Sequence, residues 1–312
     1  MDKPSAPLAP RLNIYGAVAA NRVRTLALLG VFTAIVALIA YAVGEVMAPG
    51  YGAAALPFGV GVSAVSATGT YFAGDRLVLG MSKARLLRPD EEPQLRNVVE
   101  ALAIGSGLPM PALYVVEDGA PNAFATGRDP VHASIAVTRG LLDKLDRTEL
   151  EGVLAHEMSH VGNHDIRTLL LTTVLAGTIV LFADLLLRWM RFGGVRRGRR
   201  DRDGGGGALI LVVALVLAIV GPIVARLITL AVSREREYLA DASAALLTRY
   251  PPGLASALRK IAADPEPLEV ANKATAALWI WNPLKDRPAF LDSLFETHPP
   301  IAERIRRLEA MG

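Results

Sequence analysis

The sequence contains no cysteine, and this absence excludes several kinds of site. A chain without cysteine has no disulfide framework, no thiolate ligands for zinc and no cysteine nucleophile. Aromatic residues are also few, at 6% of the chain. Any transition metal in this protein is therefore expected to be held by histidine and carboxylate side chains.

The chain also lacks a basic character that extends over its whole length. The formal net charge is only +3 over 312 residues, although the isoelectric point is near 9.2. The positive excess is local, because seven arginines lie between Arg188 and Arg202. We therefore expect no nucleic-acid partner.

What the sequence has in abundance is uncharged hydrophobic sequence, with 52% hydrophobic residues. The run from Thr25 to Gly44 is 20 residues long, enough for a helix to cross a hydrocarbon core about 30 Å thick. A second run lies within Ala53 to Ala73. We predict a tail at 1–24 and a two-span hairpin at 25–74, in a lipid bilayer. Lysines and arginines flank the hairpin but are missing between the spans, so both ends are expected in the cytoplasm.

The small residues of the second run have two interpretations. The sequence from Gly59 to Ala64 matches the G-x-G-x-x-A dinucleotide fingerprint. That fingerprint works only between a strand and a helix, whereas here it lies inside a hydrophobic run. Gly59, Ser63 and Ala67 recur every four residues, which favours a stripe where another helix packs closely.

Two further hydrophobic segments are predicted within 168–232. They are Leu169 to Leu187 and Ala208 to Val232, joined by an Arg/Gly-rich connector at 188–207. If both segments cross the bilayer, the arginines lie on the outer side, against the positive-inside rule. A hairpin that does not fully cross is the other interpretation, and the sequence leaves both open. We interpret the connector as a flexible, solvated linker.

The rest of the chain predicts an α+β soluble domain, mostly helical with a small sheet, in two parts at 75–167 and 233–312. Strands are expected at Ala112–Val116 and Ala133–Val137, the latter either a core strand or an edge for an extended peptide. One helix is expected to begin near Asp146 or Thr148 with a capping box. Four more helices are predicted at Glu92–Ile104, Ser233–Thr248, Leu254–Ala262 and Pro300–Ala310.

The chemistry is carried by His156-Glu157-Met158-Ser159-His160. Histidines four residues apart lie on one face of a helix, so both imidazoles can bind one zinc ion, with Glu157 beside the bound water. Zinc lowers the pKa of that water to about 7, and the carboxylate takes its proton before attack on a carbonyl. Chance predicts only about 0.004 such patterns in a chain of this composition.

A catalytic zinc ion needs a third protein ligand. Glu237 is the preferred candidate, on a helix whose alanines allow close approach to the histidine helix. Asp241 lies one turn later and is expected to hydrogen-bond a ligating imidazole. His164 and Asp241 remain alternative ligands, although three ligands from one straight helix rarely converge.

These motifs resemble the HtpX-type membrane zinc proteases, which are related to the CAAX prenyl proteases. The resemblance covers most of the chain in order: the two spans, Asn122 to Gly127, the HExxH helix, Ser233 to Asp241, and Thr297-His298-Pro299-Pro300 followed by Arg304-Ile305. It implies a gluzincin-like endopeptidase of the inner membrane with one Zn²⁺ per chain, which cleaves damaged or misfolded membrane proteins at the cytoplasmic face.

The resemblance also implies roles for individual residues. His156, His160 and Glu237 would be the zinc ligands, Glu157 the catalytic base, and Asn122 with Phe124 part of the substrate groove. His298 would stand near the scissile carbonyl. Its position before two prolines and a helix is equally consistent with helix capping.

Two other classes of function stay open at this point. One is a catalytically silent membrane scaffold or chaperone-like binder, against which Glu157 argues because a structural zinc site needs no free general base. The other is a zinc hydrolase that acts on a small amphiphile. His160 lies nine residues before Leu169, about 14 Å along a helix, so cytosolic loops and unfolded segments of membrane proteins are the expected substrates. The sequence carries no signal for an oligomeric state.

Overall fold

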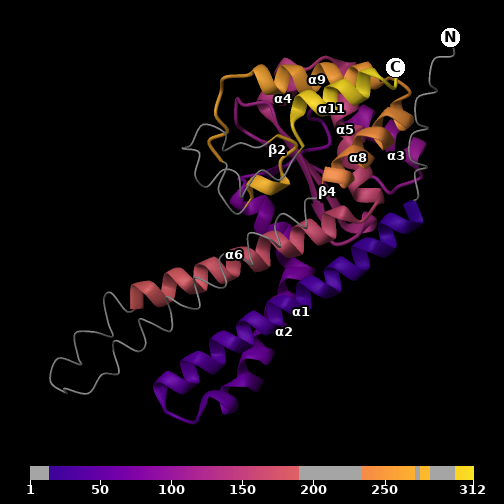
Figure 1. Ribbon diagram of the computed structural model, residues 1–312. Helices are drawn as coiled ribbons and strands as arrows, with labels where there is room; N and C mark the ends of the chain where they lie inside the picture. Colours follow the sequence, from indigo (N-terminus) through magenta and orange to yellow (C-terminus); the bar gives the residue numbers. More distant parts are fainter. Residues whose placement is uncertain (1–13, 190–233, 271–274, 282–298) are drawn as a thin grey trace.

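A helical hairpin forms one end of the molecule (Figure 1). The computed structural model describes residues 14–189, 234–270, 275–281 and 299–312. Helices α1 (Ile14–Met47) and α2 (Gly52–Met81) run side by side away from a globular head. Within the described residues, two helical stretches are long and apolar enough to span a membrane, Asn21–Glu45 and Gly52–Met81.

The surface of this hairpin is apolar, as lipid requires. Phe58 and Val65 of α2 are 73% and 74% exposed, and Leu26 of α1 is 69% exposed. Large exposed hydrophobic surfaces of this kind are rare in soluble monomers. The two spans agree with the two runs predicted from the sequence.

Small residues allow the two helices of the hairpin to pack closely. A Cβ atom added at Gly59 would lie 2.8 Å from Cβ of Ala40, and Ser63 is only 1% exposed. The interpretation as a packing stripe is therefore confirmed. The helix continues through residues 59–64 with no strand before it, which excludes a dinucleotide-binding turn.

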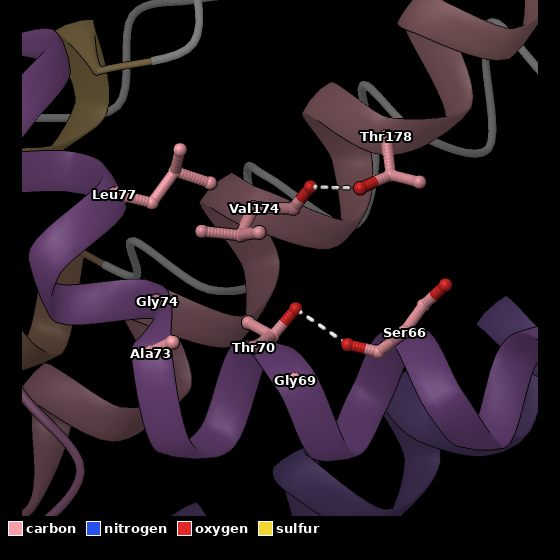
Figure 2. A pocket seen from close by; sticks show the side chains of 8 residues that line it. All are labelled: Ser66, Gly69, Thr70, Ala73, Gly74, Leu77, Val174 and Thr178. Carbon is pink, nitrogen blue, oxygen red and sulfur yellow. Dashed lines mark hydrogen bonds between the residues drawn. The ribbon is translucent and has the colours of Figure 1, made fainter.

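The third long helix, α6 (Asp165–Trp189), packs against both helices of the hairpin near the head. Phe32 of α1 shares a buried cluster with Leu171 and Leu175 of α6. Between α2 and α6 lies a groove of about 470 Å³, shown in Figure 2. Its threonine hydroxyls donate to carbonyl groups of their own helices, so the groove offers small and apolar surface. The predicted segment 208–232 lies outside the described residues, and its path stays a prediction.

A four-stranded mixed sheet lies in the head, in the order β1 (Arg85–Leu86), β2 (Ala112–Val116), β4 (Ala133–Thr138), β3 (Ala123–Gly127). Strands β2 and β4 are parallel, whereas β3 is antiparallel to β4. Strand β4 is therefore interior, and the alternative that it forms a peptide-binding edge is wrong. Strand β3 forms one edge of the sheet, and the sequence analysis predicted no strand there.

Both faces of the sheet are covered, and one of them packs against the membrane helices. One face packs against α3 (Pro93–Ser106), α5 (Arg147–Gly162) and α9 (Pro251–Ala263). The other face packs against Val78 of α2 and Leu170 of α6. Every residue of β3 and β4 is consequently buried, and neither strand shows the alternation of a half-exposed strand.

The remaining helices complete an α+β head and confirm the predicted fold class. They are α4 (Arg139–Lys144), α8 (Arg234–Thr248) and α11 (Ile301–Glu309), with short 3₁₀ turns at Pro130–His132 and Ala276–Leu278. Helix α5 begins with the capping box between Asp146 and Glu149. Helix α9 begins at Pro251 rather than after the two prolines, because proline fits the first turn of a helix.

Candidate metal centre

The metal-binding geometry begins with the two histidines of α5. Asp146 caps the helix, and the absence of a Cβ at Gly152 lets Leu254 of α9 pack directly against the α5 backbone. The Nε2 atoms of His156 and His160 lie 3.2 Å apart, one turn after the other on one face of the helix. Their rings lie nearly perpendicular, and the short distance between the two Nε2 atoms allows both to reach one ion.

Helix α8 brings Glu237 to the same point. Its two carboxylate oxygens lie 3.5 Å from Nε2 of His160 and 3.7 Å from Nε2 of His156. A tetrahedral zinc ion with bonds of about 2.0–2.1 Å separates its ligand atoms by about 3.4 Å. The three side chains therefore fit one small cation, with a fourth position left for water or substrate.

His164 does not join this cluster. Helix α5 ends at Gly162, and His164 has a left-handed backbone with φ 57° before α6 begins at Asp165. The break removes the continuous helical face that a third histidine on α5 would need. Asp241 lies behind His156, where it contacts the opposite ring nitrogen. The geometry thus favours Glu237 over both alternative ligands.

The Nδ1 atom of His156 lies 2.9 Å from Asp241, as the sequence predicts. Asp241 in turn accepts two hydrogen bonds from Arg304 of α11, at 2.9 and 2.7 Å. All three side chains are at most 2% exposed. Burial alone would raise the pKa of Asp241, but the adjacent Arg304 and the His156 hydrogen bond lower it to about 2. Burial lowers the pKa of His156 to about 4 and so favours the neutral imidazole, which is the form that binds metal.

His160 has a carboxylate partner that the sequence analysis missed. Its Nδ1 lies 3.1 Å from Oδ2 of Asp165, the first residue of α6. Burial opposes the charged imidazolium, but the Asp165 hydrogen bond and the charge of Glu237 raise the pKa of His160 to about 9 in the metal-free site. An acidic residue five positions after the motif, at the start of the next helix, is the signal that could have identified it. Both histidines thus have a carboxylate on the side away from the metal, an arrangement that fixes ring orientation.

Glu157 lies beside this cluster and is only 2% exposed. Burial raises the pKa of its carboxyl group to about 7, near the value that suits a general base at neutral pH. The backbone N–H of Ala125 in β3 partly offsets this rise in the pKa, and Ala125 lines the same cavity as Glu157. Strand β3 therefore lies directly against the position where chemistry would occur.

The space over the cluster is small and closed. The cavity measures about 20 Å³, which is enough for one water molecule but not for a peptide. Its cover comes from Ile166 and Leu169 of α6 and from Leu278 and Ile280 of the segment 275–281. The site in this conformation is assembled but shut.

The predicted substrate-groove residues contact this cover. The amide of Asn122 donates to the carbonyl oxygen of Trp281 at 3.0 Å, and the ring of Phe124 packs edge-on against Trp279, 4.7 Å between centroids. The backbone N–H of Ile280 donates to the carbonyl oxygen of Ala123 at 2.9 Å, on the outer side of β3. Neither Asn122 nor Phe124 is open to a peptide in this conformation, so their substrate role stays a prediction. His298 lies outside the described residues.

The HExxH helix, the carboxylate from a second helix and the membrane hairpin together define a membrane metallohydrolase. The model of Peptidase family M48 matches residues 89–312. The chain belongs to this family and is a metalloprotease.

Relatives of nearly equal length support the same assignment. A "Protease HtpX homolog" of Dictyoglomus thermophilum is 44% identical over 302 residues, covering 96% of this chain and 95% of the relative. A second, of Tropheryma whipplei, is 44% identical over 299 residues, covering 96% and 99%. Among solved structures, Ste24p of S. mikatae matches with a TM-score of 0.50 at 19% identity, over 95% of this chain and 67% of that one. This last likeness concerns the fold alone.

Proposed function

We propose that this protein is a zinc-dependent endopeptidase that cleaves misfolded or damaged membrane proteins on the cytoplasmic side of the cell membrane. The observation that carries the proposal is the convergence of His156, His160 and Glu237 beside the buried Glu157. Two histidines and a carboxylate, with no cysteine in the chain, are the ligand set that suits catalytic zinc.

In this proposal the three ligands hold one Zn²⁺ per chain. Bound zinc supplies Lewis acidity, which makes water more acidic and polarises a substrate carbonyl. Glu157 takes the proton of the attacking water and later donates it to the leaving amine. Asp241 and Asp165 keep the two imidazoles in the tautomer whose Nε2 faces the metal.

The outer side of β3 is the place we propose for the substrate backbone. An extended peptide that pairs there would use backbone hydrogen bonds, which suits a protease that accepts many sequences. The Ala123 carbonyl faces this side and now accepts from Ile280. We therefore propose that the cover formed by residues 275–281 and the start of α6 moves before cleavage, with Asn122 and Phe124 lining the opened groove and His298 reaching the scissile carbonyl.

The membrane setting narrows the substrate class in this proposal. Asp165 begins α6 and also contacts His160, so the site lies where the head meets the membrane helices. Positive charge flanks the hairpin on the head side, and by the positive-inside rule this supports a cytoplasmic head. Cytosolic loops and unfolded segments of membrane proteins are then the chains closest to the site.

Cleavage of an unfolded polypeptide by the detergent-purified protein tests the proposal. Glu157→Gln keeps the shape of the side chain, so it should retain zinc and lose turnover. Glu237→Ala should weaken zinc retention, whereas Glu235→Ala, an exposed carboxylate on the same helix, should change neither. Chelation should abolish cleavage and zinc should restore it.

The results also separate the alternatives. Full cleavage by Glu157→Gln would overturn the mechanism, and full zinc content in Glu237→Ala would overturn the ligand set. One zinc ion per chain without cleavage of any polypeptide would favour a scaffold or a hydrolase of small amphiphiles. Substrate trapping with Glu157→Gln would then identify the bound partner.

A further inference from the structure

A buried asparagine on the first membrane helix contacts the metal centre through one intermediate residue. Asn21 lies at the start of the first candidate span, where it is 1% exposed. Its Nδ2 donates to Oδ1 of Asp165 at 2.7 Å and to the carbonyl oxygen of Asn163 at 2.9 Å. Both hydrogens of the amide group are therefore used, on residues more than 140 positions away in the sequence.

The two oxygens of Asp165 have different partners. Oδ1 accepts from Asn21 and lies 3.5 Å from Arg236, while Oδ2 faces Nδ1 of His160 at 3.1 Å. The contacts at Oδ1 restrict the rotation of the carboxylate, and its orientation sets the direction of the bond from Oδ2 to His160. The chain of contacts thus runs from α1 through Asp165 to the ring whose Nε2 faces Glu237.

The burial of Asn21 indicates that its hydrogen bonds contribute to the structure. A polar amide placed at the end of a hydrophobic span and removed from water is costly unless its hydrogen bonds are made. Asn21 makes both hydrogen bonds of its amide nitrogen at the junction of α5 and α6, where His164 breaks the helix, while its Oδ1 has no partner among the described residues. If packing were the only requirement at position 21, an apolar residue would meet it, as Leu28 and Phe32 do further along the same helix.

We propose that Asn21 is a positioning residue of the metal site: by holding Asp165, it directs His160 toward the metal, so that the membrane helix α1 is part of the metal-binding architecture. This inference rests on the proposed zinc site and adds a residue to it. Its consequence is that the metal site is complete only when the membrane hairpin is docked on the head.

The test is the zinc affinity of the full-length protein in detergent or nanodiscs, measured by competition with a chromogenic chelator after metal removal. Substituting a residue that hydrogen-bonds the second ring nitrogen of a metal-binding histidine typically weakens metal affinity 10–100-fold. Asn21 acts on such a residue rather than on the histidine itself, so we expect a smaller loss of zinc affinity, about 3–10-fold, for Asn21→Ala. Asn21→Asp keeps the shape but sets a carboxylate against Asp165, so its loss should be larger. Asn21→Ser keeps a donor and should recover part of the affinity.

Thr25→Val is the matched control. Thr25 lies one turn further along α1, where its hydroxyl donates to the backbone carbonyl of Asn21 at 2.8 Å and pairs with the hydroxyl of Thr168 on α6 at 3.2 Å. Neither bond involves the side chain of Asn21 or Asp165. This variant removes an α1–α6 hydrogen bond and should leave zinc affinity unchanged. Thermal unfolding of all variants reports general loosening of the hairpin.

Zinc affinity equal to wild type in Asn21→Ala and Asn21→Asp would overturn the inference, as would an equal loss in Thr25→Val. If Asn21→Ala does not fold, the isosteric Asn21→Asp and the donor-retaining Asn21→Ser decide the question by their order of affinity. A wild-type protein that binds no zinc would instead contradict the proposed function. The two failures are therefore distinguishable without measuring proteolysis.

Discussion

The two metal-binding histidines are held from opposite directions, and the difference between their supports is instructive. His156 is oriented by Asp241, which Arg304 of the C-terminal helix α11 holds with two hydrogen bonds. His160 is oriented by Asp165, which the neutral amide of Asn21 holds from the membrane helix α1. We call these the head arm (Asp241 and Arg304) and the membrane arm (Asp165 and Asn21).

The arms differ in charge and in what they connect. The head arm is a fully buried ion pair with two hydrogen bonds inside the soluble domain. The carboxylate of the membrane arm accepts from a neutral amide of a segment far away in the sequence, and its ion pair with Arg236 is longer, at 3.5 Å. Breaking a buried ion pair leaves an uncompensated charge, while losing a neutral donor leaves a smaller deficit. We therefore expect stability to depend more on the head arm, while both arms contribute to zinc affinity.

The largest effect should follow from breaking the head arm. Arg304→Ala leaves the buried carboxylate of Asp241 without its arginine, so the free energy of unfolding should fall by about 3–5 kcal/mol. Chemical unfolding in detergent measures this loss. Arg307→Ala, on an exposed face of the same helix, is the control and should change little. A double variant with Asp241→Asn should recover much of the stability, and failure to do so would contradict the ion-pair account.

Breaking the membrane arm at its carboxylate should act mainly on the metal. Asp165→Ala removes the partner of His160 Nδ1, so zinc affinity should fall about 10–100-fold. Competition with a chelator measures the change, and Asp143→Ala, an exposed aspartate, controls for the lost charge. A loss of stability as large as that of Arg304→Ala would remove the distinction between the arms.

The pH dependence of zinc binding should sharpen the comparison. Below its pKa of about 9, His160 of the metal-free site carries a proton that zinc must displace. Apparent zinc affinity should therefore rise about tenfold per pH unit through neutral pH and level off near pH 9. Asp165→Asn removes the charge that raises this pKa and should move the plateau to lower pH by about one unit. An unchanged profile would contradict the role of Asp165.

The smallest expected effect is a stability loss that leaves both arms intact. Asp146→Ala removes the capping box of α5, so the free energy of unfolding should fall by about 1 kcal/mol. Zinc affinity should stay within error of wild type, since His156 and His160 lie about three and four turns further along the helix. A parallel loss of affinity would mean that general destabilisation alone explains the effects of the other variants.

Local patterns predicted much of this structure because they are decided by nearby residues. The spacing of His156 and His160, the capping box at Asp146 and the two spans all follow from helix geometry and hydrophobic length. The predicted contact between Asp241 and His156 also follows from helical spacing once Glu237 is placed on the same helix.

The missed features depend on contacts between distant segments. Strand β3 has no alternating pattern because the membrane helices bury the face that would otherwise meet water. The spacing of Asp165 after His160 was a usable signal, but its contact with Asn21 could not be predicted from the sequence, since the two residues lie 144 positions apart. The cover over Glu157 comes from residues 275–281, far beyond the HExxH helix.

A double-mutant cycle on zinc affinity tests the central claim most directly. We would measure the zinc dissociation constants of wild type, Asn21→Ala, Asp165→Ala and the double variant, together with the same cycle for Asn21→Ala and Asp241→Asn. If α1 acts through Asp165, the double Asn21/Asp165 variant should be no weaker than Asp165→Ala alone, while the Asn21 and Asp241 losses should add in free energy. Additive losses for Asn21 and Asp165 would contradict the claim that the membrane helix positions His160.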